Sequence, residues 1–327
     1  MNKISFKKIT GTFVDGLASD IPSNNWCAED WKREFNSFKA LGIDTVIIIR
    51  VGFKDSAMYK SEVMNTTLHE DPDLIAIMLR EAERTGISLY IGMYDTMKHW
   101  PLNDWQNEVA INRELIYELN QRYNKFPAFK GWYMSHEGSL HTHPNQIWKP
   151  LCQTIRSFDK ERPIIVSPRY HGRKCDASWP VTPEIHARHF DYLLTEMEGL
   201  IDAYAFMDGH VDFCELESYV KATSEVFAKH NVSYWSNLET FDRDMPWKFP
   251  PIEWMKLRHK LEVVQPYVEK IITFEAPHFL SPNSMFPSAH KLYNRYLDYL
   301  KTKDYSKIKH PPKVELKRNC MEIVNVG

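Results

Sequence analysis

Residues 41–50 read LGIDTVIIIR, and this stretch decides the fold. The segment before it, about Ala28 to Leu41, carries large aromatic residues at helical spacing. Gly42 ends that helix, and the unbroken apolar run 46–49 is typical of a parallel strand buried on both faces. A helix that passes through a glycine into such a strand is the repeating unit of an α/β protein.

The same alternation extends to both ends of the chain. It predicts strands at Ile9–Val14, Asp44–Val51, Ile87–Tyr94, Phe129–Ser135, Pro163–Ser167, Ala203–Met207, Val232–Asn237 and Lys270–Phe274. Helices are expected at about Ala28–Leu41, Leu74–Arg84, Asp104–Tyr123, Pro144–Phe158, Thr182–Leu200, Glu215–His230, Ile252–Pro266 and Ser288–Lys301. Repeated βα units of this kind can close into a single (β/α)8 TIM barrel, which we expect over residues 1–304, with a tail at 305–327. An open, doubly wound sheet is the alternative, but no glycine-rich phosphate turn follows the first strand.

Composition narrows the class of ligand. The 327 residues carry a formal net charge of -2, so no basic excess points to nucleic acid or to a membrane surface. The chain is rich in aromatic residues, with 10 Trp, 16 Tyr and 17 Phe, and exposed aromatic faces stack on sugars. We therefore expect a carbohydrate partner. No signal peptide or transmembrane run is seen, so the chain as written is expected in the cytoplasm, or in the periplasm or outside if a leader was removed. The oligomeric state is left open.

Polar residues recur where the predicted strands end. In a barrel these positions meet at one mouth, where active sites of this fold lie. They are Asp15, Arg50, Tyr94, Asp95, His136, Glu137, Arg169, Tyr170, Asp208, Asn237, Glu239 and Glu275. Carboxylates gathered in one place repel and raise each other's pKa, so a cation, a polyhydroxylated ligand or catalysis is needed to explain them.

Glu137 and Glu239 form the strongest pair. They follow the fourth and seventh strands, which lie across the mouth from each other. Cleavage of a glycosidic bond needs one carboxyl group to protonate the leaving oxygen and a second to attack or support the anomeric carbon. The pair therefore predicts a glycoside hydrolase.

The sequence also resembles a known group at these positions. Glutamates at the ends of strands four and seven resemble those of the large TIM-barrel glycoside hydrolase clan, where they serve as acid/base and nucleophile. The segments ITGTFVD (9–15), LGIDTVI (41–47) and GWY (131–133) look like an uncharacterised bacterial family, catalogued as a domain of unknown function among candidate glycosidases. The resemblance covers most of residues 9–300. It implies a retaining mechanism, in which Glu239 attacks and Glu137 acts first as acid and then as base.

One departure and several companion residues complete the expected site. The clan has Asn before its acid/base residue, where this chain has His136. The remaining strand-end residues are expected to bind substrate hydroxyls, and stacking platforms are expected at Trp100, Trp179 and Trp235, of which the last could equally be a core residue. No cofactor and no metal are expected, because His141 and His143 lie in a loop without a recognisable ligand set. A non-catalytic carbohydrate-binding barrel and, behind it, a metal-dependent hydrolase are the rival interpretations.

Overall fold

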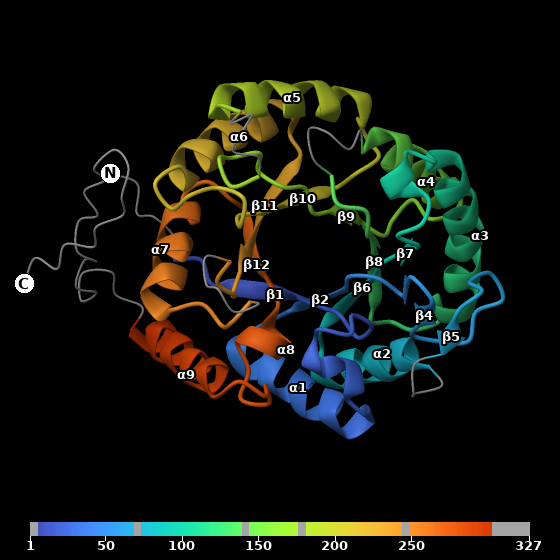
Figure 1. Cartoon of the computed structure of the whole chain (residues 1–327), viewed down its shortest axis with the longest axis horizontal. Coiled ribbons are helices and arrows are strands. Elements are labelled where there is room, and N and C mark those ends of the chain that lie inside the picture. The colour runs from blue at the N-terminus through green and yellow to red at the C-terminus, as the bar shows by residue number, and fades with distance from the viewer. Residues whose placement is uncertain (1–5, 69–72, 139–143, 176–180, 244–248, 303–327) are drawn as a thin grey trace, which may run out of the picture.

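The computed structural model describes residues 6–68, 73–138, 144–175, 181–243 and 249–302. Eight parallel strands close into a barrel, in which the last strand pairs with the first (Figure 1). In chain order they are β1 (Ile9–Val14), β2 (Thr45–Ile48), β6 (Ser88–Ile91), β8 (Phe129–Met134), β9 (Ile164–Val166), β10 (Ala203–Met207), β11 (Ser233–Glu239) and β12 (Lys270–Phe274). The predicted (β/α)8 barrel is confirmed. The division from a tail at residue 304 stays a prediction, because residues 303–327 lie outside the described ranges.

Helices surround the barrel on its outer side (Figure 1). The long ones are α1 (Ala28–Leu41), α2 (Leu74–Thr85), α3 (Trp105–Tyr123), α4 (Asn145–Phe158), α5 (Pro183–Glu196), α6 (Leu216–His230), α7 (Trp254–Val264) and α9 (Pro287–Thr302). Short elements on the connections are α8 (Ala276–Phe279) and the 3-10 turns η1 (Pro22–Asn25) and η2 (Trp100–Leu102). Within the described ranges, no helix combines the length and the apolar character that crossing a bilayer requires.

Glycines end two of these helices as the sequence predicts. Gly42 follows α1 with a φ of 78°, and Gly86 follows α2 with a φ of 74°. Both lie in the left-handed region, which a residue without Cβ adopts at little cost. At the other end of α2, the Asp73 side chain accepts a hydrogen bond from the Ala76 N–H and so caps the first turn. At each of these two glycines the helix ends, and the chain continues into the next barrel strand.

The second and third barrel strands are shorter than predicted. The chain leaves the barrel after Ile48 and Ile91 and builds a separate small sheet at the mouth. Its strands are β3 (Gly52–Phe53), β4 (Ser56–Ala57), β5 (Thr67–Leu68) and β7 (Tyr94–Asp95). The apolar pattern of the sequence continues beyond these two barrel strands because the small sheet also has a buried side. The seventh strand is longer than predicted and includes Glu239 itself.

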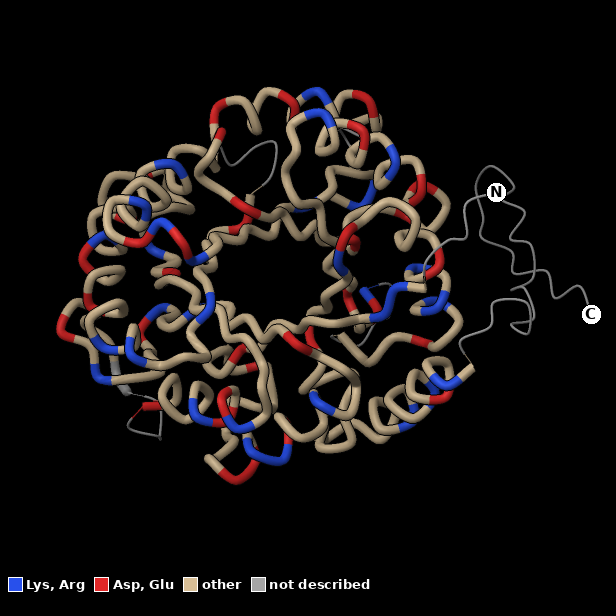
Figure 2. The backbone as a smooth tube through the Cα atoms, turned by 180° about the vertical axis from the view of Figure 1, so that it is seen from behind, with Lys and Arg blue, Asp and Glu red and all other residues tan. Residues whose placement is uncertain are grey.

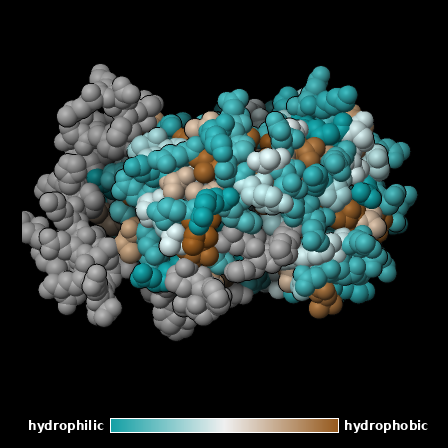
Figure 3. Space-filling view, turned by 90° about the horizontal axis from the view of Figure 1, so that it is seen from above, coloured by the Kyte–Doolittle hydropathy of each residue, from teal (hydrophilic) through white to brown (hydrophobic). Residues whose placement is uncertain are grey.

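Two apolar layers hold the barrel together. One fills its interior, and the other lies between the strands and the helices. Along β8, Tyr133 belongs to the inner layer while Trp132 and Met134 belong to the outer one, as strand alternation predicts. Charged residues lie mostly on the helices and connections (Figure 2), and the outer face in Figure 3 is largely hydrophilic.

Candidate active site

A cavity of about 380 Å³ opens at the carboxyl ends of the barrel strands. Glu137, three residues after β8, and Glu239, the last residue of β11, both line it. The other polar lining residues are Asp20, Arg50, Ser167, Asn237, Arg243 and His278. The sequence-predicted pair of glutamates therefore meets in one cavity, together with Arg50 and Asn237 from the expected binding residues.

Glu137 is the accessible member of the pair. Its side chain is 40% exposed, and Arg169 Nε lies 3.8 Å from Glu137 Oε2. A carboxyl group that is exposed at the cavity can exchange a proton with a bound ligand.

Glu239 is buried and tightly held. Arg243, four residues later, donates from Nε to Oε2 at 2.6 Å and from Nη2 to Oε1 at 2.5 Å. Burial raises the pKa of Glu239 above its ordinary value, and the charges of Arg243 and Lys260 oppose that shift. The pair is not sealed from solvent, because the Arg243 side chain is one-third exposed.

The position of the Glu239 carboxylate depends on two neighbours in the preceding βα unit, directly after β10. Asp208 accepts a hydrogen bond from the Glu239 backbone N–H at 3.0 Å and another from Lys260 Nζ at 3.2 Å. Gly209 lies against the carboxylate itself, since a Cβ at this residue would be 1.9 Å from Glu239 Oε2. Asp208 therefore supports the end of β11. At residue 209, only a glycine leaves room for the Glu239 carboxylate.

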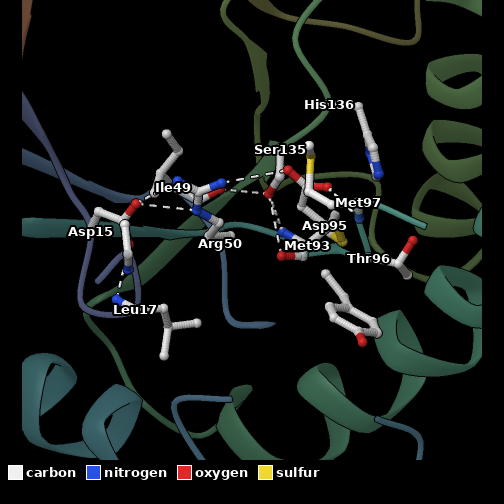
Figure 4. A network of polar contacts seen from close by, with 12 residues as sticks. Asp15, Leu17, Ile49, Arg50, Met93, Asp95, Thr96, Met97, Ser135 and His136 are labelled. Atoms are coloured by element: carbon white, nitrogen blue, oxygen red, sulfur yellow. Dashed lines mark hydrogen bonds and ion pairs between the residues drawn. The ribbon is translucent and has the colours of Figure 1, made fainter. Parts of the chain in front are cut away.

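Arg50 joins two buried carboxylates beside the cavity (Figure 4). Its Nη2 lies 2.6 Å from Asp15 Oδ2, and its Nη1 lies 3.5 Å from Asp95 Oδ2. Asp15 is fully buried and also accepts from the N–H groups of Leu17 and Ala18. Of the three charged groups, Arg50 faces the cavity, and the two aspartates hold its guanidinium in place.

His136 does not face the cavity. It is buried, and its Nε2 lies 2.8 Å from Glu108 Oε1 on α3. Trp100 packs edge-on against the His136 ring and donates from Nε1 to Asp95 Oδ1 at 2.7 Å. Both residues were expected to contact substrate, and the structure instead places them in the packing behind the loop that carries Glu137.

Asp95, Glu108 and His136 could in principle hold a metal ion, because one ligand atom from each lies within 4.8 Å of the others. The carboxylate oxygens of Glu108 and Asp95 already accept hydrogen bonds from other protein groups. Glu108 accepts from the Thr96 N–H at 3.2 Å and Asp95 Oδ1 accepts from Trp100. The cluster is therefore well explained as a hydrogen-bonded support of the loops between β7 and α3.

Several other expected residues lie away from the cavity. Glu275 is fully buried and accepts from the Asp15 N–H at 3.0 Å, and burial raises the pKa of Glu275 well above its ordinary value. Tyr170 is buried against Tyr234, and Tyr94 donates to the Lys54 carbonyl in the small sheet.

The expected tryptophan platforms do not line the described part of the cavity. Trp235 lies inside the barrel in register with Lys270, at the start of β12 and far from the mouth. It is partly buried and packs against the inner layer, which is closer to the core position that the sequence left as an alternative than to a stacking platform. Trp179, like His141 and His143, lies outside the described residues.

The sequence interpretation missed the residues that give the cavity its character. Arg243 lies in the loop after β11, and its position four residues beyond Glu239 was the only available signal. It also missed three polar lining residues, Asp20, Ser167 and His278. Many of the other missed residues are apolar, and one group of them comes from that loop, from the end of β12 and from the segment around α8: Phe241, Phe249, Phe274, Phe279, Met285 and Phe286.

The closed barrel and the two glutamates at its mouth are the features of a glycosidase-like TIM barrel. Within that class, residues 9–286 match the family model "Domain of unknown function (DUF4434)", and the chain belongs to this family. A search of curated proteins found no match.

Solved structures agree with this assignment. The chain is 34% identical to a candidate alpha-L-fucosidase from Bacteroides thetaiotaomicron, with a TM-score of 0.86 over 90% of this chain and 94% of that one. It is 10% identical to the GH99 endo-alpha-mannosidase from the same genus and species, with a TM-score of 0.57 over 90% and 98% of the two chains. Alpha-L-fucosidase isoenzyme 2 from Paenibacillus thiaminolyticus is also 10% identical, with a TM-score of 0.53 over 90% and 50%. The last two likenesses show the fold alone.

Proposed function

We propose that this protein is a retaining glycoside hydrolase, with Glu137 as acid/base and Glu239 as nucleophile. The observation that carries the proposal is that both glutamates line one cavity and differ in environment. Glu137 is 40% exposed and lines the cavity, so it can reach the oxygen of a bound ligand that gives or takes a proton. Glu239 is buried and paired with Arg243; burial raises the pKa of Glu239, while the charges of Arg243 and Lys260 oppose that rise and so support the ionised form that a nucleophile needs.

Arg243 has a defined part in this mechanism. In the ligand-free geometry it occupies both oxygens of Glu239, so attack requires that it release at least one of them. Its side chain is partly exposed and comes from a loop, so a bound sugar can displace it without disturbing the barrel. Glu239 then attacks the anomeric carbon while Glu137 protonates the departing glycosidic oxygen, which leaves with the aglycone and gives the glycosyl-enzyme. Glu137, now ionised, deprotonates water, which attacks the anomeric carbon and releases the sugar and the Glu239 carboxylate.

The name of the 34%-identical relative suggests the first substrate to try. That protein is a candidate alpha-L-fucosidase, so we propose α-L-fucosides as the leading test among monosaccharide glycosides. Arg50, Asn237 and Ser167 line the cavity and are the proposed partners of sugar hydroxyls. Among the described residues, no group donates a hydrogen bond to Asn237 Oδ1, which leaves this oxygen available as an acceptor.

Hydrolysis of a panel of 4-nitrophenyl glycosides, beginning with the α-L-fucoside, tests the proposal. Glu137→Gln and Glu239→Gln should each lower kcat/KM by at least about 10²-fold, while Glu29→Gln on the exposed side of α1 should leave it unchanged. Azide should restore turnover to Glu239→Ala. In a crystal structure, a retaining enzyme should show the two carboxyl groups about 5 to 5.5 Å apart. Full activity in both Gln variants would refute the assignment.

A non-catalytic carbohydrate-binding barrel is the second candidate, and the closed Arg243–Glu239 pair is the observation that favours it. In that case Glu239 would orient Arg243 toward a ligand and never react. The two functions separate in one experiment. Saturable sugar binding to the wild type, without turnover of any glycoside in the panel, would favour the binding module.

A further inference from the structure

Part of the cavity lining is formed by a group of apolar side chains. We call this group the apolar wall, and it consists of Phe241, Phe249, Phe279, Met285 and Phe286. These residues come from the loop after β11, from α8 and from the segment that precedes α9. The same cavity is also lined by Arg50, Glu137 and Asn237. The lining therefore combines polar groups with a large apolar group.

Ring contacts make the apolar wall continuous. The Phe241 ring centroid lies 4.8 Å from that of Phe249 and 5.2 Å from that of Phe279. It also lies 6.2 Å from Phe274, which reaches the inner layer of the barrel through Phe13. These spacings are those of packed aromatic pairs. The rings form one surface that runs from the floor of the cavity to its rim.

His278 extends this surface rather than interrupting it. Its ring is stacked on Phe279 at 4.4 Å and on Phe286 at 5.3 Å, with interplanar angles of 5° and 14°. Burial lowers the pKa of His278 to about 4. The imidazole is therefore neutral at pH 7 and presents a flat, uncharged ring among the phenylalanines.

Part of the wall is exposed to solvent. At the rim, Phe249 is 37% exposed and Met285 is 66% exposed. Exposed apolar side chains that gather at a cavity mark a ligand surface. Arg243 links the surface to the reacting groups, because its guanidinium lies 5.1 Å from the Phe241 centroid and 5.7 Å from that of Phe249 while it holds Glu239.

We propose that the apolar wall binds a flat, apolar aglycone, so that the substrate is an aryl glycoside rather than a sugar chain. This inference rests on the proposed glycosidase function, since it assigns the polar and the apolar lining residues of one cavity to the two parts of one substrate. The methyl group of a deoxysugar would need only one or two of these side chains. A second sugar ring would need hydroxyl partners, and the wall itself supplies none.

Fluorescence titration with free 4-methylumbelliferone, a flat aromatic aglycone, tests the wall without any sugar. The wild type should bind it saturably. The double variant Phe249→Ala/Met285→Ala should bind at least about fourfold more weakly. Both residues are exposed, so the change should not disturb folding. Leu102→Ala removes a side chain that is 78% exposed and does not line the cavity, and it should bind like the wild type.

The results separate this inference from the proposed function. Absence of saturable binding to the wild type, or equal binding to the wild type and the double variant, would overturn the aglycone assignment. So would methyl α-L-fucoside binding that weakens as much as the aromatic probe in the double variant. If instead the probe binds as expected while no glycoside is cleaved, the wall stands and the hydrolase assignment fails.

Discussion

Replacing Gly209 by alanine is the most direct way to move the Glu239 carboxylate without changing its chemistry. An alanine Cβ at this residue would lie 1.9 Å from Glu239 Oε2 and 2.3 Å from the carboxylate carbon. Non-bonded heavy atoms settle at about 3.5 Å or more. The carboxylate must therefore retreat by more than about 1 Å, or else the loop after β10 must shift.

The size of the effect follows from that displacement. A reacting group misplaced by about 1 Å can cost about 10²-fold in rate. We expect Gly209→Ala to lower kcat/KM by about this factor on whichever 4-nitrophenyl glycoside the wild type cleaves fastest. Circular dichroism should show a folded protein, because the altered residue lies at the mouth and outside the apolar layers.

Gly86→Ala is the matched control. Gly86 has a φ of 74° and nothing within 4 Å of its missing Cβ, so alanine there strains the backbone without touching the site. It should lower the free energy of unfolding by about 1 to 2 kcal/mol and leave kcat/KM unchanged. Wild-type activity in Gly209→Ala, alongside an inactive Glu239→Gln, would show that the rate does not depend on where this carboxylate sits.

Two further expectations concern buried carboxyl groups. His136→Asn, which introduces the residue found in the clan, should cost about 3 to 5 kcal/mol in urea denaturation because it strands Glu108 without its partner; unchanged stability would contradict the pairing. Burial raises the pKa of Glu34 from its ordinary value of 4.5 to about 7, so its contribution to stability is full below pH 4.5 and is lost as the pH rises toward 7. Between pH 4.5 and 8 the wild type should lose about 3 kcal/mol of unfolding free energy relative to Glu34→Gln, and parallel pH profiles for the two proteins would contradict this.

The barrel could be predicted because its signals are local. Apolar runs such as 46–49 and glycines such as Gly42 act within a single strand or helix end. Strand numbering then placed Glu137 and Glu239 at one mouth, since parallel strands all end on the same side of a barrel. Neither step required knowledge of a side chain's partner.

The site required that knowledge, which the sequence does not contain. Asp95 and Glu275 follow strands as a binding residue would, yet burial forces each to satisfy its charge or its oxygens with protein groups. The apolar wall has no periodicity, because Phe241 and Phe286 come from irregular segments and Phe279 ends the short helix α8. Trp235 illustrates the remaining difficulty. The sequence pattern of a strand does not show whether an aromatic residue lies at the bottom of the barrel or at its mouth.

The contact between Asp15 and Glu275 has a consequence for the order in which the protein becomes functional. These residues are 260 positions apart, and the hydrogen bond between them forms only when the last strand closes against the first. Contacts of such long sequence separation are the slow ones in folding. During synthesis, a chain that already includes Glu137 and Glu239 but not residue 275 therefore lacks the hydrogen bond that supports Asp15. Asp15 in turn holds Arg50. Activity would therefore require the complete barrel. A truncated product that ends before residue 275 would be inactive although it contains both glutamates.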